Sequence, residues 1–124
     1  MEFTPENITF LPKDHIFVFG SNRAGRHGRG AAKLAVKKFG AVYGKGDGIM
    51  GQSYGIATKG HKMEVLSLKN IEVAVYRFLR FASKKPHLTF VVTKIGCGLA
   101  GYNDKDIAPM FASAGENVVL PKGW

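Results

Sequence analysis

Short apolar runs separated by polar, glycine-rich segments organise this chain. The first run, residues 16–19 (IFVF), is uninterrupted and ends at Gly20, which is typical of a strand that is buried on both faces. Residues 53–58 (SYGIAT) alternate enough to predict a second strand, and residues 88–93 (LTFVVT) predict a third because they are apolar and β-branched. A fourth strand is expected at residues 117–120.

Between the strands, apolar residues recur at the spacing of a helix that buries one face. The first helix is expected to begin at Ala31. The second is expected to be capped by Ser67 and stopped by Pro86, and the third to follow a cap at Asn103. The predicted core-facing residues are Ala32, Ala35, Val36 and Phe39 in the first helix, Ile71, Ala74, Val75, Phe78 and Ala82 in the second, and Ile107, Met110, Phe111 and Ala114 in the third.

The remaining segments carry weaker patterns. Residues 1–14 contain two prolines and predict an irregular lead-in or an edge strand. Residues 41–52 are rich in glycine and predict a long mobile loop that closes over a site, with simple disorder as the alternative. Residues 63–67 predict a short additional strand.

The alternation of strand and helix predicts one α/β domain over residues 1–124, with a mainly parallel central sheet and helices on both faces. In such sheets ligands bind at the carboxyl ends of the strands. Those ends are expected at residues 20–22, at residues 58–59 and at the glycine-rich residues 96–98. These three segments should therefore lie along one rim of the sheet.

The loop between the first strand and the first helix is the strongest candidate for a binding site. Its glycines allow tight turns and a close approach of the backbone to a ligand. The hydrogen-bond donors crowded among them are Asn22, Arg23, Arg26, His27 and Arg29. Together with the positive end of the following helix, they predict a bound phosphate. The glycine spacing is neither GxxxxGK[ST] nor GxGxxG, so a tight connection without a ligand is the alternative.

The composition of the chain limits the partners, the location and the cofactors that we expect. The formal charge of +9 draws acidic molecules, and the basic residues on the predicted helices fit either a solvated face or a nucleic-acid surface. No apolar stretch approaches a membrane span of roughly 20 residues, and the first ten residues do not resemble a signal peptide, so we expect a cytoplasmic protein with no membrane partner. A single cysteine, Cys97, and four scattered histidines give no metal-ligand spacing, so no metal and no cofactor are expected.

Three stretches are similar to a known family. The sequence LPKDHIFVFGSNRAGRHGRGAAKLAVKKFG, followed by SYGIATKG and VVTKIGCGLAGYNDKDI, resembles the macrodomains. Within them the similarity is to the branch that contains the terminal ADP-ribose protein glycohydrolase and the antitoxin that removes ADP-ribose from DNA, and to small phage and bacterial proteins of macro-like fold. The resemblance covers residues 13–107, and IGCGLAG and GRGAAKLAVKKFG are its most specific parts.

The resemblance implies a three-layer macro-like fold with a cleft for ADP-ribose or for an ADP-ribosylated protein or nucleic acid. By position, Asp14 would approach the adenine, Asn22 would contact the distal ribose, and residues 27–31 and 96–101 would bind the diphosphate. The implied ligand-binding residues are Asp14, Ser21, Asn22, Gly28, Arg29, Gly30, Ala31, Gly96, Cys97, Gly98, Leu99, Ala100, Gly101 and Tyr102.

The resemblance also implies catalysis by a lysine. In that branch a lysine attacks the distal ribose with help from an acid in the second glycine loop, and Lys59 stands at the position of that lysine. Ala100 occupies the position of the acid, and Asp104 is the nearest carboxylate downstream. The implied catalytic residues are Lys59 and Asn22, with His27 as an alternative acid or base. From the residues alone, all three also fit ordinary loop and turn positions.

Three functions follow as hypotheses. The first is an enzyme that binds ADP-ribose at the two glycine loops and hydrolyses an ADP-ribosyl linkage. The second is a non-catalytic module that binds ADP-ribose or a related nucleotide signal, which the alanine at position 100 favours. The third is a basic nucleic-acid-binding domain, against which the predicted basic helices lack interleaved aromatic residues. A modified nucleic acid as the substrate would join the first hypothesis to the third.

Overall fold

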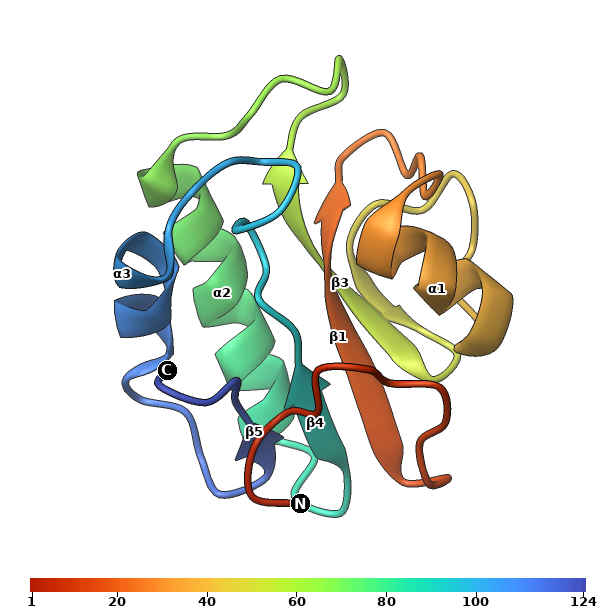
Figure 1. Ribbon diagram of the computed structural model, residues 1–124, viewed down its shortest axis with the longest axis vertical. Helices are drawn as coiled ribbons and strands as arrows, with labels where there is room; N and C mark the ends of the chain where they lie inside the picture. The colour runs from red at the N-terminus through yellow and green to blue at the C-terminus, as the bar shows by residue number, and fades with distance from the viewer.

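The computed structural model describes residues 1–124 and contains a mixed five-stranded sheet with three α-helices (Figure 1). The strand order is β2-β3-β1-β4-β5, with β1 at the centre. β1 pairs in parallel with β3 and β4, β4 pairs in parallel with β5, and only β2 is antiparallel. The strands are β1 His15–Asn22, β2 Gly48–Met50, β3 Ser53–Lys59, β4 Thr89–Val92 and β5 Val118–Val119. The predicted α/β class and mainly parallel sheet are therefore confirmed.

The central strand β1 is buried on both faces, as its uninterrupted apolar sequence predicts. Ile16 and Val18 pack into a cluster with α2 (Leu68–Ser83), whereas Phe17 and Phe19 pack on the opposite face with α1 (Gly30–Lys38). This division follows from the period of two along a strand. Each fully buried side chain of this size contributes about 1.5–3 kcal/mol of transfer free energy. The two clusters fix β1, and so they fix the loop that follows it.

Helix α2 forms as its sequence predicts. The Ser67 side chain accepts a hydrogen bond of 3.2 Å from the N–H of Asn70, so it satisfies one of the free donors of the first turn. Ile71, Val75 and Phe78 are fully buried against the sheet, and the helix ends before Pro86. In Figure 1 this helix lies beside the sheet on the side opposite α1.

Three local predictions need correction. Residues 41–52 are not one irregular loop, because Gly48–Met50 form β2 and pair with Ser53–Gly55. Residues 63–67 do not form a strand, and the segment contributes only an isolated bridge between Lys59 and Val65. Val36 is 39% exposed, because α1 ends two residues later and its buried face is carried by Ala32 and Ala35.

The third helix is shorter than its apolar spacing suggests. α3 spans Asp104–Ile107 and continues as a 3₁₀ turn, η1, over Ala108–Phe111. Pro109 lies at the start of that turn, and it removes an N–H that an α-helix would have used. Ile107 and Phe111 are buried nevertheless, while Met110 and Ala114 are only partly buried against the same cluster.

Residues 1–14 form an irregular lead-in rather than an edge strand. The Thr4 hydroxyl donates a hydrogen bond of 2.6 Å to the carbonyl of Val92, and Ile8 and Leu11 are buried in the cluster that contains α1. The lead-in therefore covers part of the face that α1 leaves open. Among the helices, none combines the length and the apolar character that crossing a membrane requires.

Candidate functional site

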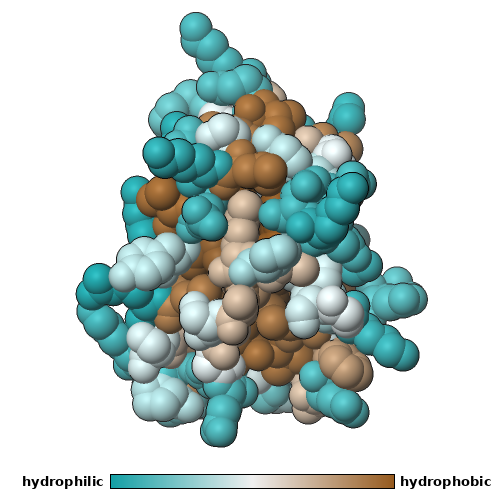
Figure 2. Space-filling model, turned by 90° about the vertical axis from the view of Figure 1, so that its left-hand side faces the viewer, coloured by the Kyte–Doolittle hydropathy of each residue, from teal (hydrophilic) through white to brown (hydrophobic).

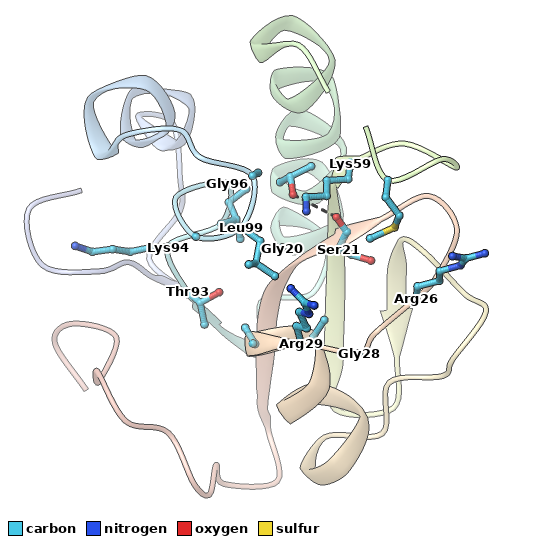
Figure 3. A pocket seen from close by; sticks show the side chains of 18 of the residues that line it. Gly20, Ser21, Arg26, Gly28, Arg29, Lys59, Thr93, Lys94, Gly96 and Leu99 are labelled. Carbon is cyan, nitrogen blue, oxygen red and sulfur yellow. Dashed lines mark hydrogen bonds between the residues drawn. The ribbon is translucent and has the colours of Figure 1, made fainter. Parts of the chain in front are cut away.

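A pocket of about 510 Å³ lies at the carboxyl ends of β1, β3 and β4 (Figure 3). It is lined from β1 by Gly20 and Ser21, and from β3 by Thr58 and Lys59. The loops after β1 and after β4 form its two opposing sides. The predicted site residues that line it are Ser21, Gly28, Arg29, Gly30, Ala31, Lys59, Gly96, Gly98, Leu99 and Ala100. The expected meeting of three strand ends at one rim is thus observed.

The charges around this pocket have one sign. Arg26, Arg29, Lys59 and Lys94 line it, and no Asp or Glu does. In Figure 3 Lys59 points between the two glycine loops, whereas Arg26 and Lys94 extend to either side. Lys94 forms an ion pair of 3.0 Å with Asp104, which lies outside the pocket. The pocket therefore offers a positive environment to an anion.

The first turn of α1 contributes free donors to the same pocket. Arg29 is the N-cap residue and supplies no side-chain cap, so no side chain satisfies the first amides of the helix. Gly30, Ala31 and Ala32, the first three helical residues, all line the pocket. Free amides and the positive end of the helix dipole make such a turn suitable for a phosphate.

Asn22 is not brought into the pocket. It is 5% exposed, and its side chain makes two hydrogen bonds of 2.8 Å with the backbone of Arg26, one as donor and one as acceptor. Ser21, next to it, donates through its hydroxyl to the carbonyl of Gly46, and the Thr58 hydroxyl donates to the Ser21 carbonyl at 3.2 Å (Figure 3). In this structure Asn22 shapes the loop instead of facing a ligand.

His27 does not line the pocket either. It is 3% exposed, its Nε2 lies 2.8 Å from the carbonyl oxygen of Lys45, and its ring packs edge-on against Phe19. Its Nδ1 is buried without a hydrogen-bond partner. The histidine links the loop after β1 to residues 43–45, and its ring is buried under the loop, away from the pocket.

The second glycine loop contributes only part of the predicted set. Cys97, Gly101 and Tyr102 do not line the pocket. The Tyr102 hydroxyl donates a hydrogen bond of 2.6 Å to the carbonyl of Leu66, and it ties the loop to the segment before α2. Burial, followed by a hydrogen bond with Asp104, raises the pKa of the Cys97 thiol to about 11. This agrees with a packing role for the cysteine.

Asp14 lies at the far end of the molecule from the pocket. It precedes β1, whose eight residues separate it from the strand end that carries Ser21. Its carbonyl accepts a hydrogen bond from the N–H of Thr89 at the start of β4, and its carboxylate is exposed. The structure does not bring Asp14 to the site.

Several lining residues were absent from the sequence prediction. Thr93 and Lys94 directly follow β4, so the rule that ligands bind at strand ends could have found them. Tyr43 comes from the loop before β2 and is 64% exposed. Met63 lines the pocket from the turn after β3 with an unusual φ of 64°. No local signal marks either of the last two residues.

A second cavity continues the pocket. Its volume is about 660 Å³, and it shares Gly30, Ala31, Thr93 and Lys94 with the first. From there it runs between Leu34 of α1 and residues of the lead-in. The two cavities together form an elongated site that is cationic at the strand ends. Toward the lead-in it is lined by the apolar residues Ile8, Phe17 and Leu34 and by the charged residues Glu6 and Lys122.

The site holds no constellation suited to a metal, since no group of three His, Cys, Asp or Glu side chains could bind one. Comparisons of this chain with protein-family models, with curated proteins and with solved structures found no match.

Proposed function

We propose that this chain is a macrodomain-like protein whose pocket binds ADP-ribose or a related ADP-ribosyl nucleotide. The observation that carries the proposal is that both glycine-rich loops, through residues 28–31 and 96–100, line one pocket. A diphosphate between them would meet backbone amides, the first turn of α1 and basic side chains. It would face no carboxylate, because none lines the pocket.

The same proposal covers the fold as a three-layer macro-like arrangement. It is supported by the two core clusters, which lie on opposite faces of the sheet, one with α1 and the other with α2 and η1. The order of elements also supports it. Strand β1, a glycine loop and helix α1 are followed by β4 and a second glycine loop, which is the order in which the resemblance covers residues 13–107.

The ligand we propose is elongated. The diphosphate would occupy the cationic pocket, the distal ribose would lie toward Lys59, and the nucleoside would enter the cavity beside Leu34. A pocket of about 510 Å³ lies within the range of about 300–1,000 Å³ that is common for small-molecule sites. Asp14 has no part in this arrangement, because it lies at the other end of β1.

Hydrolysis of an ADP-ribosyl linkage is the second candidate function, favoured by the position of Lys59. An amine attacks as its free base, and a partner must protonate the leaving group. Neither Asn22 nor His27 lines the pocket, and no carboxylate does. We therefore favour binding without turnover, with hydrolysis as the alternative that a product assay decides.

Two substitutions test the pocket from its opposite sides. Gly28→Glu and Gly98→Glu each add a carboxylate where the backbone adopts no positive φ and where nothing lies within 4 Å of the new Cβ. Each should weaken ADP-ribose binding by at least about tenfold, or about 1.4 kcal/mol, in a calorimetric titration.

Ala112→Glu is the matched control, because it adds the same charge at an exposed position that lines neither cavity. It should leave the affinity for ADP-ribose unchanged. Full affinity in both glycine variants would contradict the proposal.

A further inference from the structure

The exposed face of α2 carries a basic stripe with an aromatic ring in it. Lys69, Tyr76, Arg77 and Arg80 are all exposed, and Tyr76 is 60% exposed. The guanidinium of Arg80 lies over the Tyr76 ring, 6.0 Å from its centroid. Figure 2 views the side of the molecule on which α2 and α3 lie, and there hydrophilic side chains stand around apolar atoms. Because Tyr76 lies among these cations, the helix does combine basic and aromatic residues.

The protein itself neutralises part of the positive charge in and beside the stripe, since Asp47 pairs with Arg77, and backbone hydrogen bonds, helped by the charge of Arg23, lower the pKa of Glu64. The molecule has two ion pairs, Arg77 with Asp47 at 3.8 Å and Lys94 with Asp104 at 3.0 Å, among 18 lysines and arginines. Within α2 the sole acidic residue is Glu72. The stripe therefore presents a positive potential to a partner in solution.

Arg23 lies between the stripe and the pocket at the strand ends. The N–H of Arg23 donates a hydrogen bond of 2.9 Å to the carbonyl of Lys59, which lines the pocket. Arg23 and Arg77 in turn line a hollow of about 370 Å³ between the end of β3 and α2, and Asp47, His61 and Asn70 are its other polar residues. Arg23, His61 and Arg77 thus lie between Lys59 and Arg80, with the carboxylate of Asp47 among them.

We propose that this surface, defined by Arg23, Tyr76, Arg77 and Arg80, binds a single strand of nucleic acid. Phosphates of the strand contact the three arginines, and a base stacks on Tyr76. An exposed aromatic ring on a basic surface favours a single strand over a duplex or an acidic protein, because unpaired bases stack on such rings.

The test measures fluorescence anisotropy of a labelled single-stranded oligonucleotide of about 16 nucleotides, the upper end of common site sizes. The double variant Arg77→Gln with Arg80→Gln should bind at least tenfold more weakly at low salt. The slope of log affinity against log salt should fall by about 1.4, since each phosphate contact to a single strand contributes about 0.7.

The double variant Lys37→Gln with Lys38→Gln is the control, because it removes the same charge from exposed positions in the last turn of α1. An equal loss of affinity in this control would overturn the proposal, because it would show that net charge alone attracts the strand. Full affinity in the α2 variant would overturn it as well.

A second variant separates stacking from charge. Tyr76→Leu should lower the affinity for the single strand about fivefold or more, because a base loses its stacking partner. It should change the affinity for a duplex of the same length less. Polyglutamate that competes as well as unlabelled oligonucleotide would overturn the proposal in favour of an acidic protein partner.

The pocket variant Gly28→Glu keeps the two proposals apart. It should bind the unmodified oligonucleotide as the natural chain does, although it loses ADP-ribose. If the natural chain binds ADP-ribose but not the oligonucleotide, only the proposed nucleic-acid surface is overturned. If it binds the oligonucleotide but not ADP-ribose, only the proposed ADP-ribose pocket is overturned.

Discussion

The side chain of Asn22 and the backbone of Arg26 are joined by two hydrogen bonds, each of 2.8 Å. The amide of Asn22 accepts from the Arg26 N–H and donates to the Arg26 carbonyl. This pair closes the turn that carries the chain out of β1, and it directs residues 28–31 toward the pocket. A residue that the sequence marks as a ligand contact thus determines the shape of the loop that would hold the ligand.

Replacing Asn22 by Ala should therefore lower stability before it changes any chemistry. The N–H and the carbonyl of Arg26, whose hydrogen bonds are partly buried, lose their partner, and each lost hydrogen bond costs about 0.5–1.5 kcal/mol. Urea denaturation should show a lower free energy of unfolding. The control Asn70→Ala removes an exposed side-chain amide that makes no hydrogen bond, keeps the backbone N–H that binds Ser67, and should change stability by less than about 0.5 kcal/mol. Equal stability of both variants would contradict the role given to Asn22.

Gly25→Ala should destabilise the protein strongly. Gly25 has a φ of +71°, and a Cβ there would overlap the backbone of Gly44 and Lys45. The positive φ alone costs about 1–2 kcal/mol for other residues, and the overlap adds to it. Thermal unfolding should show a lower Tm than for the natural chain. Gly28→Ala, where φ is not positive and no atom lies within 4 Å, should leave Tm unchanged, and a similar drop in both variants would argue against this loop geometry.

Lys59 contributes charge to the pocket in either candidate function. Lys59→Ala should weaken ADP-ribose binding about fivefold, or about 1 kcal/mol, whereas Lys59→Arg keeps the charge and should keep most of the affinity. If the natural chain releases product from an ADP-ribosylated substrate, both variants should release none, because a guanidinium does not act as the nucleophile. Product from the arginine variant would exclude Lys59 as the attacking group.

Cys97 should react slowly with iodoacetamide at pH 8. The thiolate is the reactive form, and burial raises the pKa of Cys97 to about 11, so the thiolate is scarce at this pH and increases only as the pH approaches 11. Alkylation followed by mass spectrometry should be at least about tenfold slower than for a small free thiol, whose pKa is about 8.5. Asp104→Asn should speed it, because Asp104 also raises this pKa. Rapid labelling of the natural chain at pH 8 would contradict the packing role.

The sequence predicts the framework of this molecule well where a single local pattern decides the structure. The apolar run at 16–19 is stable only as a central strand that is buried between two core clusters. Ser67 and Pro86 mark the limits of α2 through a cap and a missing donor. The sequence does not predict β2, because pairing with β3, and not the intrinsic strand propensity of its three residues, holds them extended. The early end of α3 does not follow from the apolar spacing, because Pro109 ends the α-helical hydrogen bonding there.

The sequence also predicts only part of the candidate site. The rule that ligands bind at strand ends correctly brings both glycine loops and Lys59 to one pocket. It cannot tell which side chains of a loop face inward, so Asn22 and His27, which are bonded to the backbone of Arg26 and Lys45, could not be separated from Arg29. Tyr43 and Met63 reach the pocket from loops whose path depends on tertiary contacts.

The most direct test of the central claim is a calorimetric titration of the natural chain with ADP-ribose, beside AMP and NAD at the same salt. We predict micromolar binding of ADP-ribose that exceeds the affinity for AMP, because the two glycine loops would hold the diphosphate that AMP lacks. No heat of binding with ADP-ribose, or equal affinity for all three nucleotides, would contradict the assignment of this pocket to an ADP-ribosyl ligand.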